Sequence, residues 1–324
     1  MAEELAGTEF RFTDEQGQLR AAVRAFCTEH VDEGSVRELM VSDPPFDAKV
    51  WARLGSELGV LGLAVPESRG GAGGSLVDQA VAVEELGAAL ACGPFFGTVY
   101  LAIPALVAAS SGDDVLAPLV DGTRTAAFAV GDVAGAFDAA AVTVVSSPQD
   151  QGWALTGTVE RVVDAGAADS IVIAAKVPEG VGLFAVDADS VGVQRVPLDT
   201  LDLTRPQANV VLQDAPGLLI AGPDEAERVI TQALQVGSAL LAVEQVGAAQ
   251  HLLDLSVAYA KSRLQFGRPI GSFQAVQQRM ADAFIDVESI RWTTWHAAWL
   301  VAEGRSADRA AAIAKFWASE AGAR

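Results

Sequence analysis

A basic and aromatic group of side chains lies in the segment YAKSRLQFGRPIGSFQAVQQRMAD, residues 259–282. The guanidinium of Arg263 is a planar fork of donors that suits a phosphate. Phe266, three residues further on, is expected on the same side of a helix, where it can cover a ring or an aliphatic stem. Gln274 is expected in the first turn of the next helix, where its amide can bridge a nucleotide. The residues alone leave a second interpretation open, namely a helix-capping arginine beside a core phenylalanine.

A single acidic residue, Glu244, interrupts the apolar part of the preceding segment. A carboxylate that is poised by burial can abstract a proton from a substrate. A buried or interface carboxylate that is paired with an arginine explains the same residue.

Metal chemistry is not expected. The chain has too few histidines for a convincing ligand cluster, and its two cysteines are far apart in apolar stretches, as reduced core residues are. These residues are His30, His251, His296, Cys27 and Cys92.

The elements that must position these side chains fall into three parts. From Thr13 to about Ser110 the apolar spacing predicts helices, the first of them with Thr13 as N-cap and Gln16 at the capping-box position. Between about Thr123 and Asp214, six runs rich in Val and Ile predict short strands of a sandwich or small barrel, without the intervening helices of a parallel sheet. The runs are AAFAV, AVTVV, SIVIAA, GLFAV, VGVQRV and NVVL.

From Pro223 the helical period returns with a segment that is nearly apolar on more than one face, so we expect it inside a bundle. Two more helices follow it. Three helices without a fourth make an incomplete bundle, whose open side another chain would cover. We therefore predict an α+β fold with an N-terminal helical domain (1–115), a central β-domain (116–222) and a C-terminal helical bundle (223–324).

The charge balance excludes some partners. The 324 residues include 42 acidic and 22 basic side chains, a formal charge of −20, which repels nucleic acid and anionic membranes at long range. No run of about 18 apolar residues without charge is present, and the first ten residues lack the basic start of an export signal. We expect a soluble, cytoplasmic protein whose anionic ligands need a local basic clamp.

Four segments together resemble the acyl-CoA dehydrogenase family over nearly the whole chain. They are FTDEQGQLRAAVRAF, GLAVPESRGGAGGSLVDQAVAVEELG, WALTGTVERVVDAGAADSIVIAAK and SRLQFGRPIGSFQAVQQRMAD. The resemblance implies that FAD is the cofactor and an acyl-CoA thioester the substrate. It also implies that Arg263 and Phe266 contact the diphosphate and adenosine part of an FAD that is held mainly by a neighbouring subunit. Gln265 and Gln274 fall at positions that can join this contact.

The chain departs from the family pattern at the flavin ring. Gly131 stands where a threonine hydroxyl is expected, and Asp132 stands near a glutamate position. Arg161, Val162 and Val163 occupy the positions where the family often has Trp, Ile and Thr against the ring. Arg161 is equally explained as a surface residue of a β-turn.

The position of the catalytic base also departs from the family. In acyl-CoA dehydrogenases a glutamate removes the α-proton while the β-hydride goes to the flavin, and the glutamate lies on the long helix or in a later loop. The resemblance places Gly237 at the helical position, and the loop position lies beyond Arg324. Glu244 is the other candidate, seven residues on and about 10 Å along the same face. The small residues 237–239 leave room for a bulky acyl group or permit close helix packing.

These departures predict the auxiliary subunit of a heteromeric FAD-dependent acyl-CoA dehydrogenase that catalyses α,β-dehydrogenation. A homologous partner would supply the base and the ring site in a heterotetramer, as in the actinobacterial enzymes for steroid side-chain CoA esters that the chain resembles. One alternative is a homotetramer that binds its own FAD and uses Glu244. Another is a non-catalytic scaffold or CoA-ester binding protein of the same fold.

Overall fold

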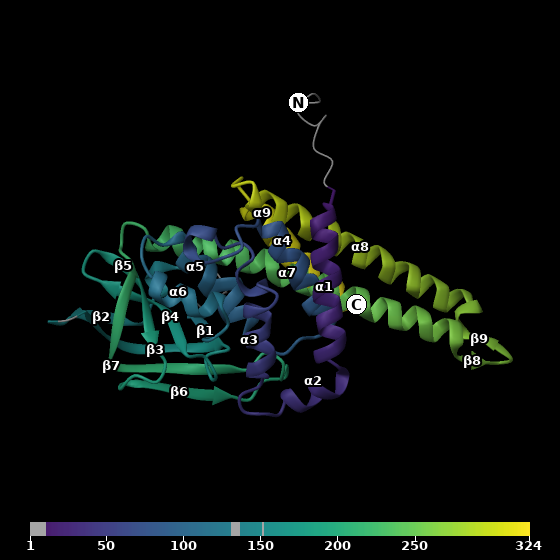
Figure 1. The fold of residues 1–324 in the computed structure, drawn as a ribbon. Coiled ribbons are helices and arrows are strands. Elements are labelled where there is room, and N and C mark those ends of the chain that lie inside the picture. The colour runs from purple at the N-terminus through teal and green to yellow at the C-terminus, as the bar shows by residue number, and fades with distance from the viewer. Residues whose placement is uncertain (1–10, 131–136, 151) are drawn as a thin grey trace, which may run out of the picture.

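A computed structural model describes residues 11–130, 137–150 and 152–324, which form a helical part, a β-barrel and a helical bundle (Figure 1). The helical part is built from six α-helices and a π-helical segment, here called η3, with two short 3-10 turns. Their bounds are α1 Asp14–His30, α2 Glu33–Leu39, α3 Ala48–Ser56, η1 Val60–Gly62, η2 Glu67–Arg69, α4 Leu76–Ala88, η3 Phe95–Ala102, α5 Ile103–Ala108 and α6 Asp113–Val120.

The predicted start of the first helix is confirmed. The Thr13 hydroxyl accepts the N–H of Gln16, and the Gln16 side chain accepts the N–H of Thr13, which is a complete capping box. The π-helical turn over Phe95–Ala102 was not predicted, because the period of an apolar run does not separate it from an α-helix.

The β-domain is a closed ring of five strands with one strand added at each of two places. Strand pairing runs β4, β2, β3, β7, β5 and back to β4, while β1 pairs with β4 and β6 with β7. The bounds are β1 Ala126–Ala129, η4 Ala139–Ala141, β2 Val145–Pro148, β3 Trp153–Val163, β4 Ser170–Val177, β5 Gly180–Asp187, β6 Val193–Leu198 and β7 Gln207–Ala221. The sequence predicted a sandwich or a small barrel, and the barrel is the one observed.

Two details of the strand prediction were wrong. The run AVTVV contributes only Val145 to a strand, because the 3-10 turn Ala139–Ala141 and two isolated buried valines account for its apolar residues. The strand Trp153–Val163 was not among the six expected runs, because Thr156, Gly157, Glu160 and Arg161 divide its apolar residues into short groups.

Both faces of the barrel wall that touches the helices are buried, which explains the continuous apolar runs. In β4, Ile171 and Ile173 point into the barrel core, while Val172 and Ala174 join the core shared with the helices. Alternate side chains of a strand point to opposite faces, so this strand needs apolar residues throughout.

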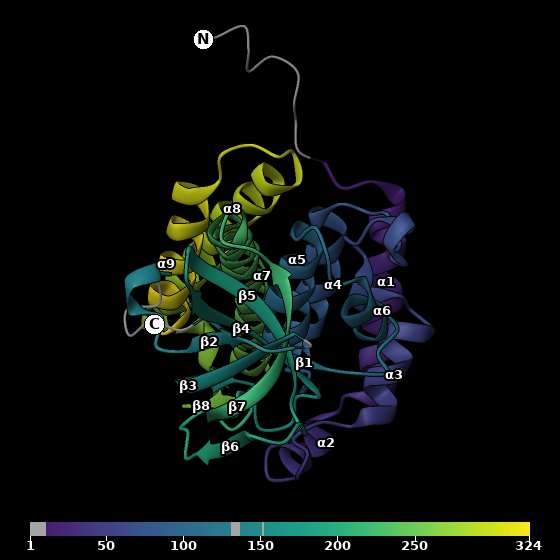
Figure 2. The same cartoon turned by 90° about the vertical axis from the view of Figure 1, so that its left-hand side faces the viewer.

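The bundle consists of α7 Ala226–Ser262, α8 Gln274–Ala302 and α9 Asp308–Gly322, with β8 Leu264–Gln265, β9 Arg268–Pro269 and η5 Ile270–Ser272 between the first two. In the described residues three helices form this bundle, as predicted. Figure 2 shows α4 and α5 on one side of α7, and α8 and α9 on the other. The apolar stretch of α7 is long enough to cross a membrane by length and composition, and 56% of it is buried inside the protein, as in a core helix.

Helices α4 and α7 touch through two glycines. A Cβ on Gly87 would lie 2.2 Å from the carbonyl oxygen of Glu244, and one on Gly247 would lie 1.9 Å from that of Glu84. Only glycine permits backbones to approach this closely. These two contacts fix where α7 lies along its own axis relative to α4. They therefore also fix the positions of the side chains that α7 carries.

The predicted α+β class is therefore the observed one. The predicted domain ranges were 1–115, 116–222 and 223–324; the position 115 lies within α6, and the strands of the barrel run from Ala126 to Ala221.

Candidate functional site

The basic and aromatic group lies at the end of the helical hairpin formed by α7 and α8, far from the barrel (Figure 1). We call residues 263–274 the hairpin tip. Helix α7 ends at Ser262, and the backbone of Arg263 is already extended. Phe266 has a φ of +54°. The expectation that Phe266 shares a helical side with Arg263 was therefore wrong, because the helix ends before both residues and Phe266 lies in the turn between β8 and β9.

The tip side chains face solvent. Phe266 is 91% exposed, and its ring meets the Phe273 ring edge-on at 6.1 Å between centroids. The guanidinium of Arg268 covers the other phenylalanine, 4.2 Å from the Phe273 centroid. Arg263 forms no ion pair with the part of the chain that the structure describes, and Gln274 is the first residue of α8, as predicted. The tip thus offers unused donors and an uncovered ring to another molecule.

Glu244, the proton-abstraction candidate, is occupied by two partners from other domains. The hydroxyl of Tyr100 in η3 donates to its Oε2 at 2.7 Å. Arg205, from the loop before β7, forms an ion pair with its Oε1. The side chains of Arg205 and Glu244 are only 17% and 19% exposed, and Tyr100 is 1% exposed. We call Tyr100, Arg205 and Glu244 the Glu244 cluster.

The electrostatics of this cluster favour its charged pair. Burial is the largest single influence on Arg205 and opposes its charge, but Glu244 together with Tyr100, Asp164 and Asp202 outweighs it, so the pKa of Arg205 lies above its ordinary value. Burial, with Glu244 next to it, also holds the pKa of Tyr100 well above the usual range. Both oxygens of the Glu244 carboxylate are engaged, one by a guanidinium and one by a phenol, so neither can reach a substrate proton without breaking one of these contacts. The interpretation of Glu244 as a paired carboxylate is the one that this geometry supports.

Asp164 adds a second buried carboxylate beside the cluster. It is 3% exposed and accepts the N–H of Gly97 at 2.8 Å. Burial raises the pKa of Asp164 from 3.8 to about 6, with Arg205 and the Gly97 N–H acting in the opposite direction. Its backbone is left-handed, at φ +65°.

The expected base position and the expected ring wall hold no catalytic group. At Gly237 a Cβ would lie 2.5 Å from Cδ2 of Leu101, so the position lacks both a side chain and room for one. Arg161 is exposed at a bulge of β3 and pairs with Glu160 at 3.4 Å, as a surface residue does. Gly131 and Asp132 lie outside the described residues.

The residues present therefore fit FAD at one end only. The tip has a cation and a ring suited to a diphosphate and an adenosine, whereas the wall positions have neither an indole nor a hydroxyl donor. Val162, at one of these positions, is buried in the barrel core.

Comparison with known proteins gives the class of the chain. Two family profiles match it, "Acyl-CoA dehydrogenase, N-terminal domain" over residues 13–113 and "Acyl-CoA dehydrogenase, C-terminal domain" over residues 227–324. Acyl-CoA dehydrogenase IpdE2 of Mycolicibacterium smegmatis is 35% identical over 309 residues, which are 95% of this chain and 83% of that protein. Acyl-CoA dehydrogenase FadE27 of Mycobacterium tuberculosis is 34% identical and covers 95% and 82%.

Solved structures agree with these relatives. The Tcur3481-Tcur3483 steroid acyl-CoA dehydrogenase, in its G363A variant, superposes with a TM-score of 0.83 at 33% identity, covering 95% of this chain and 84% of that one. The ChsE4-ChsE5 complex of Mycobacterium tuberculosis gives 0.83 at 32%, covering 98% and 85%. The chain belongs to the acyl-CoA dehydrogenase family, oxidoreductases that act on the CH–CH bond of acyl-CoA, and the family implies FAD as cofactor.

Sequence reasoning missed three members of the buried site, Tyr100, Arg205 and Asp164. Tyr100 and Asp164 stand in apolar or mixed segments that predict core and turn. Arg205 precedes Pro206 between two strands, where an arginine is ordinarily exposed. The one available signal was the lone acidic residue on an apolar helix, which requires a buried cation somewhere in the chain.

Proposed function

We propose that this chain is the auxiliary subunit of a heteromeric acyl-CoA dehydrogenase. A homologous partner supplies the glutamate base and the isoalloxazine site, and each unlike pair of the heterotetramer shares one FAD. Arg263, Gln265, Phe266 and Gln274 of this chain close over the diphosphate and adenosine end of the partner's FAD.

One observation carries the proposal: the tip residues are exposed at the end of a hairpin that points away from the chain's own barrel (Figure 1). A ring that is 91% exposed is costly to leave in water. It gains most from a partner that covers it, and the neighbouring guanidiniums of Arg263 and Arg268 favour an anionic partner.

In this proposal the partner carries the base and the ring site, and this chain holds the diphosphate and adenosine end of the cofactor. FAD, when bound, accepts the hydride from the β-carbon of the thioester. The residues of this chain neutralise the diphosphate and hold the adenosine end, which keeps the cofactor in place while the partner's base removes the α-proton. Glu244 is not the base in this proposal, because Arg205 and Tyr100 already use its oxygens.

We further propose that the substrate is a bulky, steroid-derived acyl-CoA. The support is the 33% identity to a structure that is named a steroid acyl-CoA dehydrogenase.

A flavin count tests the shared cofactor. The chain is purified alone and together with a co-expressed homologous subunit, and the flavin absorbance is compared with the protein mass. We expect no flavin in the lone chain and one per unlike pair. One flavin for each chain in the lone preparation overturns the proposal.

Turnover tests the homotetramer that uses Glu244. If Glu244 were the base, Glu244→Gln would abolish reduction of the flavin by substrate. The proposal predicts that the pair containing this variant still reduces its flavin, because the amide oxygen can accept from Arg205 while the amide NH2 donates to the Tyr100 hydroxyl oxygen.

A further inference from the structure

We infer that the space between η3, α7 and the barrel, around the helical position that the family resemblance gives to the base, is filled in this chain by its own side chains. The inference rests on the proposed function, in which only the partner's site turns over. It adds that this chain's equivalent site is closed by packing, and not only deprived of a base.

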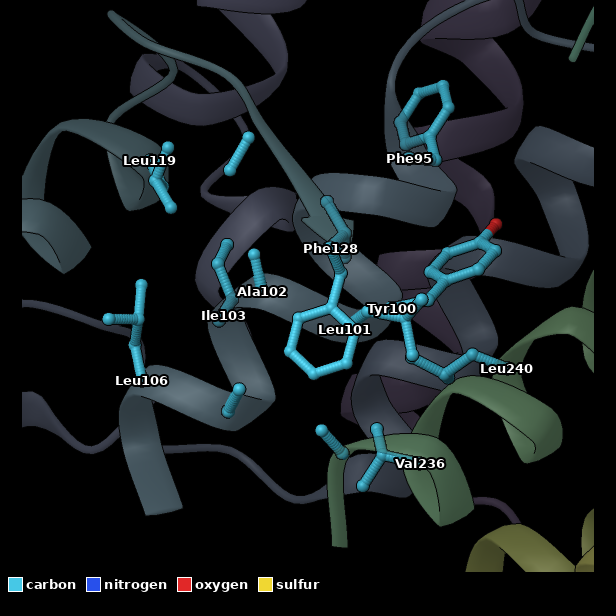
Figure 3. Packing of buried hydrophobic residues seen from close by; sticks show 14 of the residues in the cluster. Phe95, Tyr100, Leu101, Ala102, Ile103, Leu106, Leu119, Phe128, Val236 and Leu240 are labelled. Atoms are coloured by element: carbon cyan, nitrogen blue, oxygen red, sulfur yellow. The ribbon is translucent and has the colours of Figure 1, made fainter. Parts of the chain in front are cut away.

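The first observation is the contact at the base position. A Cβ on Gly237 would lie 2.5 Å from Leu101 Cδ2 and 3.2 Å from the carbonyl oxygen of Tyr100. Leu101 is 5% exposed and belongs to the main core. Figure 3 shows Tyr100 and Leu101 packed with Phe128 against Val236 and Leu240 of α7. Because residue 237 has no side chain, η3 packs directly against α7 at this position, and no space for a ligand remains beside Gly237.

The second observation is that the Glu244 cluster crosses the same space. Its three side chains come from three elements: Tyr100 from η3, Arg205 from the loop before β7 and Glu244 from α7. All three are mostly buried. A ligand inserted between α7 and the barrel at this level would have to separate a buried ion pair, which is strongly unfavourable.

The third observation is that hydrogen bonds join η3 to strand β1 and to Asp164 of the barrel. The hydroxyl of Thr98 donates to the carbonyl oxygen of Ala126 at 2.9 Å and accepts the N–H of the same residue at 2.8 Å. The N–H of Gly97 donates to Asp164, and a Cβ on Gly97 would lie 2.6 Å from the Ala126 oxygen. The η3 segment therefore has no freedom to swing away from β1.

The small residues of α7 at this level therefore serve close packing and not a bulky acyl group. Each unlike pair would then have one acyl site, formed by the partner. The packing can be tested on the lone chain, without flavin or substrate.

The test is the sign of a melting-temperature change. In an open cleft, Gly237→Leu would improve helix propensity and raise Tm by about 1–3 °C. In a filled interior the added atoms overpack, and we expect Tm to fall by about 2–8 °C. Gly17→Leu is the matched control, because Gly17 is a helical glycine of α1 with no atom within 4 Å of its would-be Cβ. A rise at both positions overturns the inference.

A second variant keeps the test decisive if Gly237→Leu fails to fold. Leu101→Ala removes the side chain that occupies the place of the missing one. The filled interior predicts that the double variant folds where Gly237→Leu alone does not, and that, where both single variants fold, the Tm of the double variant lies above that expected from adding the two single changes. Additive changes contradict the inference, while the flavin count of the pair would still decide the proposed function separately.

Discussion

Asp164 is the residue whose replacement should show most directly how the buried site is balanced. Its carboxyl is enclosed beneath η3 and has a pKa of about 6, against an ordinary value of 3.8. Between these two pH values the folded state holds the proton more tightly than the unfolded chain does. The free energy of unfolding therefore falls as pH rises through this range, and the loss is complete above it.

The magnitude follows from the two pKa values. The ionised carboxyl costs the folded state about 1.5 kcal/mol at pH 5 and about 3 kcal/mol at pH 8. Asp164→Asn keeps an oxygen that accepts the Gly97 N–H, and asparagine tolerates the left-handed backbone at φ +65°. The variant should therefore be more stable than the natural chain, by an amount that grows by about 1.5 kcal/mol from pH 5 to pH 8.

The assay is urea unfolding of both proteins at several pH values between 5 and 8, followed by tryptophan fluorescence. Asp214→Asn is the matched control. Asp214 also has a left-handed backbone, at φ +50°, but it is exposed on the barrel. The reasoning is refuted if the free energies of unfolding of Asp164→Asn and the natural chain differ by the same amount at every pH. That result would mean that the folded chain does not bury an ionised carboxylate at pH 8.

Three further outcomes follow from the described contacts. Phe266→Ala should leave the Tm of the lone chain unchanged, since the ring is exposed, but the pair should lose flavin on gel filtration. Arg205→Ala should lower the free energy of unfolding by about 3–5 kcal/mol, because Glu244 would remain buried without its cation; chemical denaturation measures it. Gly247→Ala should lower stability by about 1–3 kcal/mol, because its Cβ would meet the α4 backbone at 1.9 Å. In contrast, Gly17→Ala should raise stability by about 1 kcal/mol; thermal melts of the two variants compare them.

The sequence predicts the course of the chain well where a single local rule decides it. The capping box at Thr13 is local, and the alternation of three kinds of segment is a matter of period and composition. The closed barrel is less local. Its strand β3 was missed because Thr156, Glu160 and Arg161 interrupt the apolar pattern, although pairing with β7 makes the strand continuous.

The hairpin tip and the Glu244 cluster also differ in how far apart their residues lie in the sequence. The members of the hairpin tip could be named together from the sequence because they lie within twelve positions of one another, although the helical placement of Phe266 was wrong and their contact with a cofactor stays a prediction. The Glu244 cluster joins residues 105 and 39 positions apart in the sequence, Tyr100 to Arg205 and Arg205 to Glu244. No spacing rule connects them, so the sequence showed the carboxylate but neither of its partners.

A formal charge of −20 raises the question of how this chain can attract a diphosphate at all. Between Asp254 and Asp282 the sequence has no acidic residue but four cations, namely Lys261, Arg263, Arg268 and Arg279. Glu244 lies 18 residues before the end of α7 at Ser262, and so about 27 Å from the helix end that carries Arg263. That distance exceeds the screening length of about 8 Å in physiological salt several-fold. The projecting hairpin therefore separates a local positive field from an acidic body, and in the proposed heteromer the partner's anionic cofactor would meet these cations first.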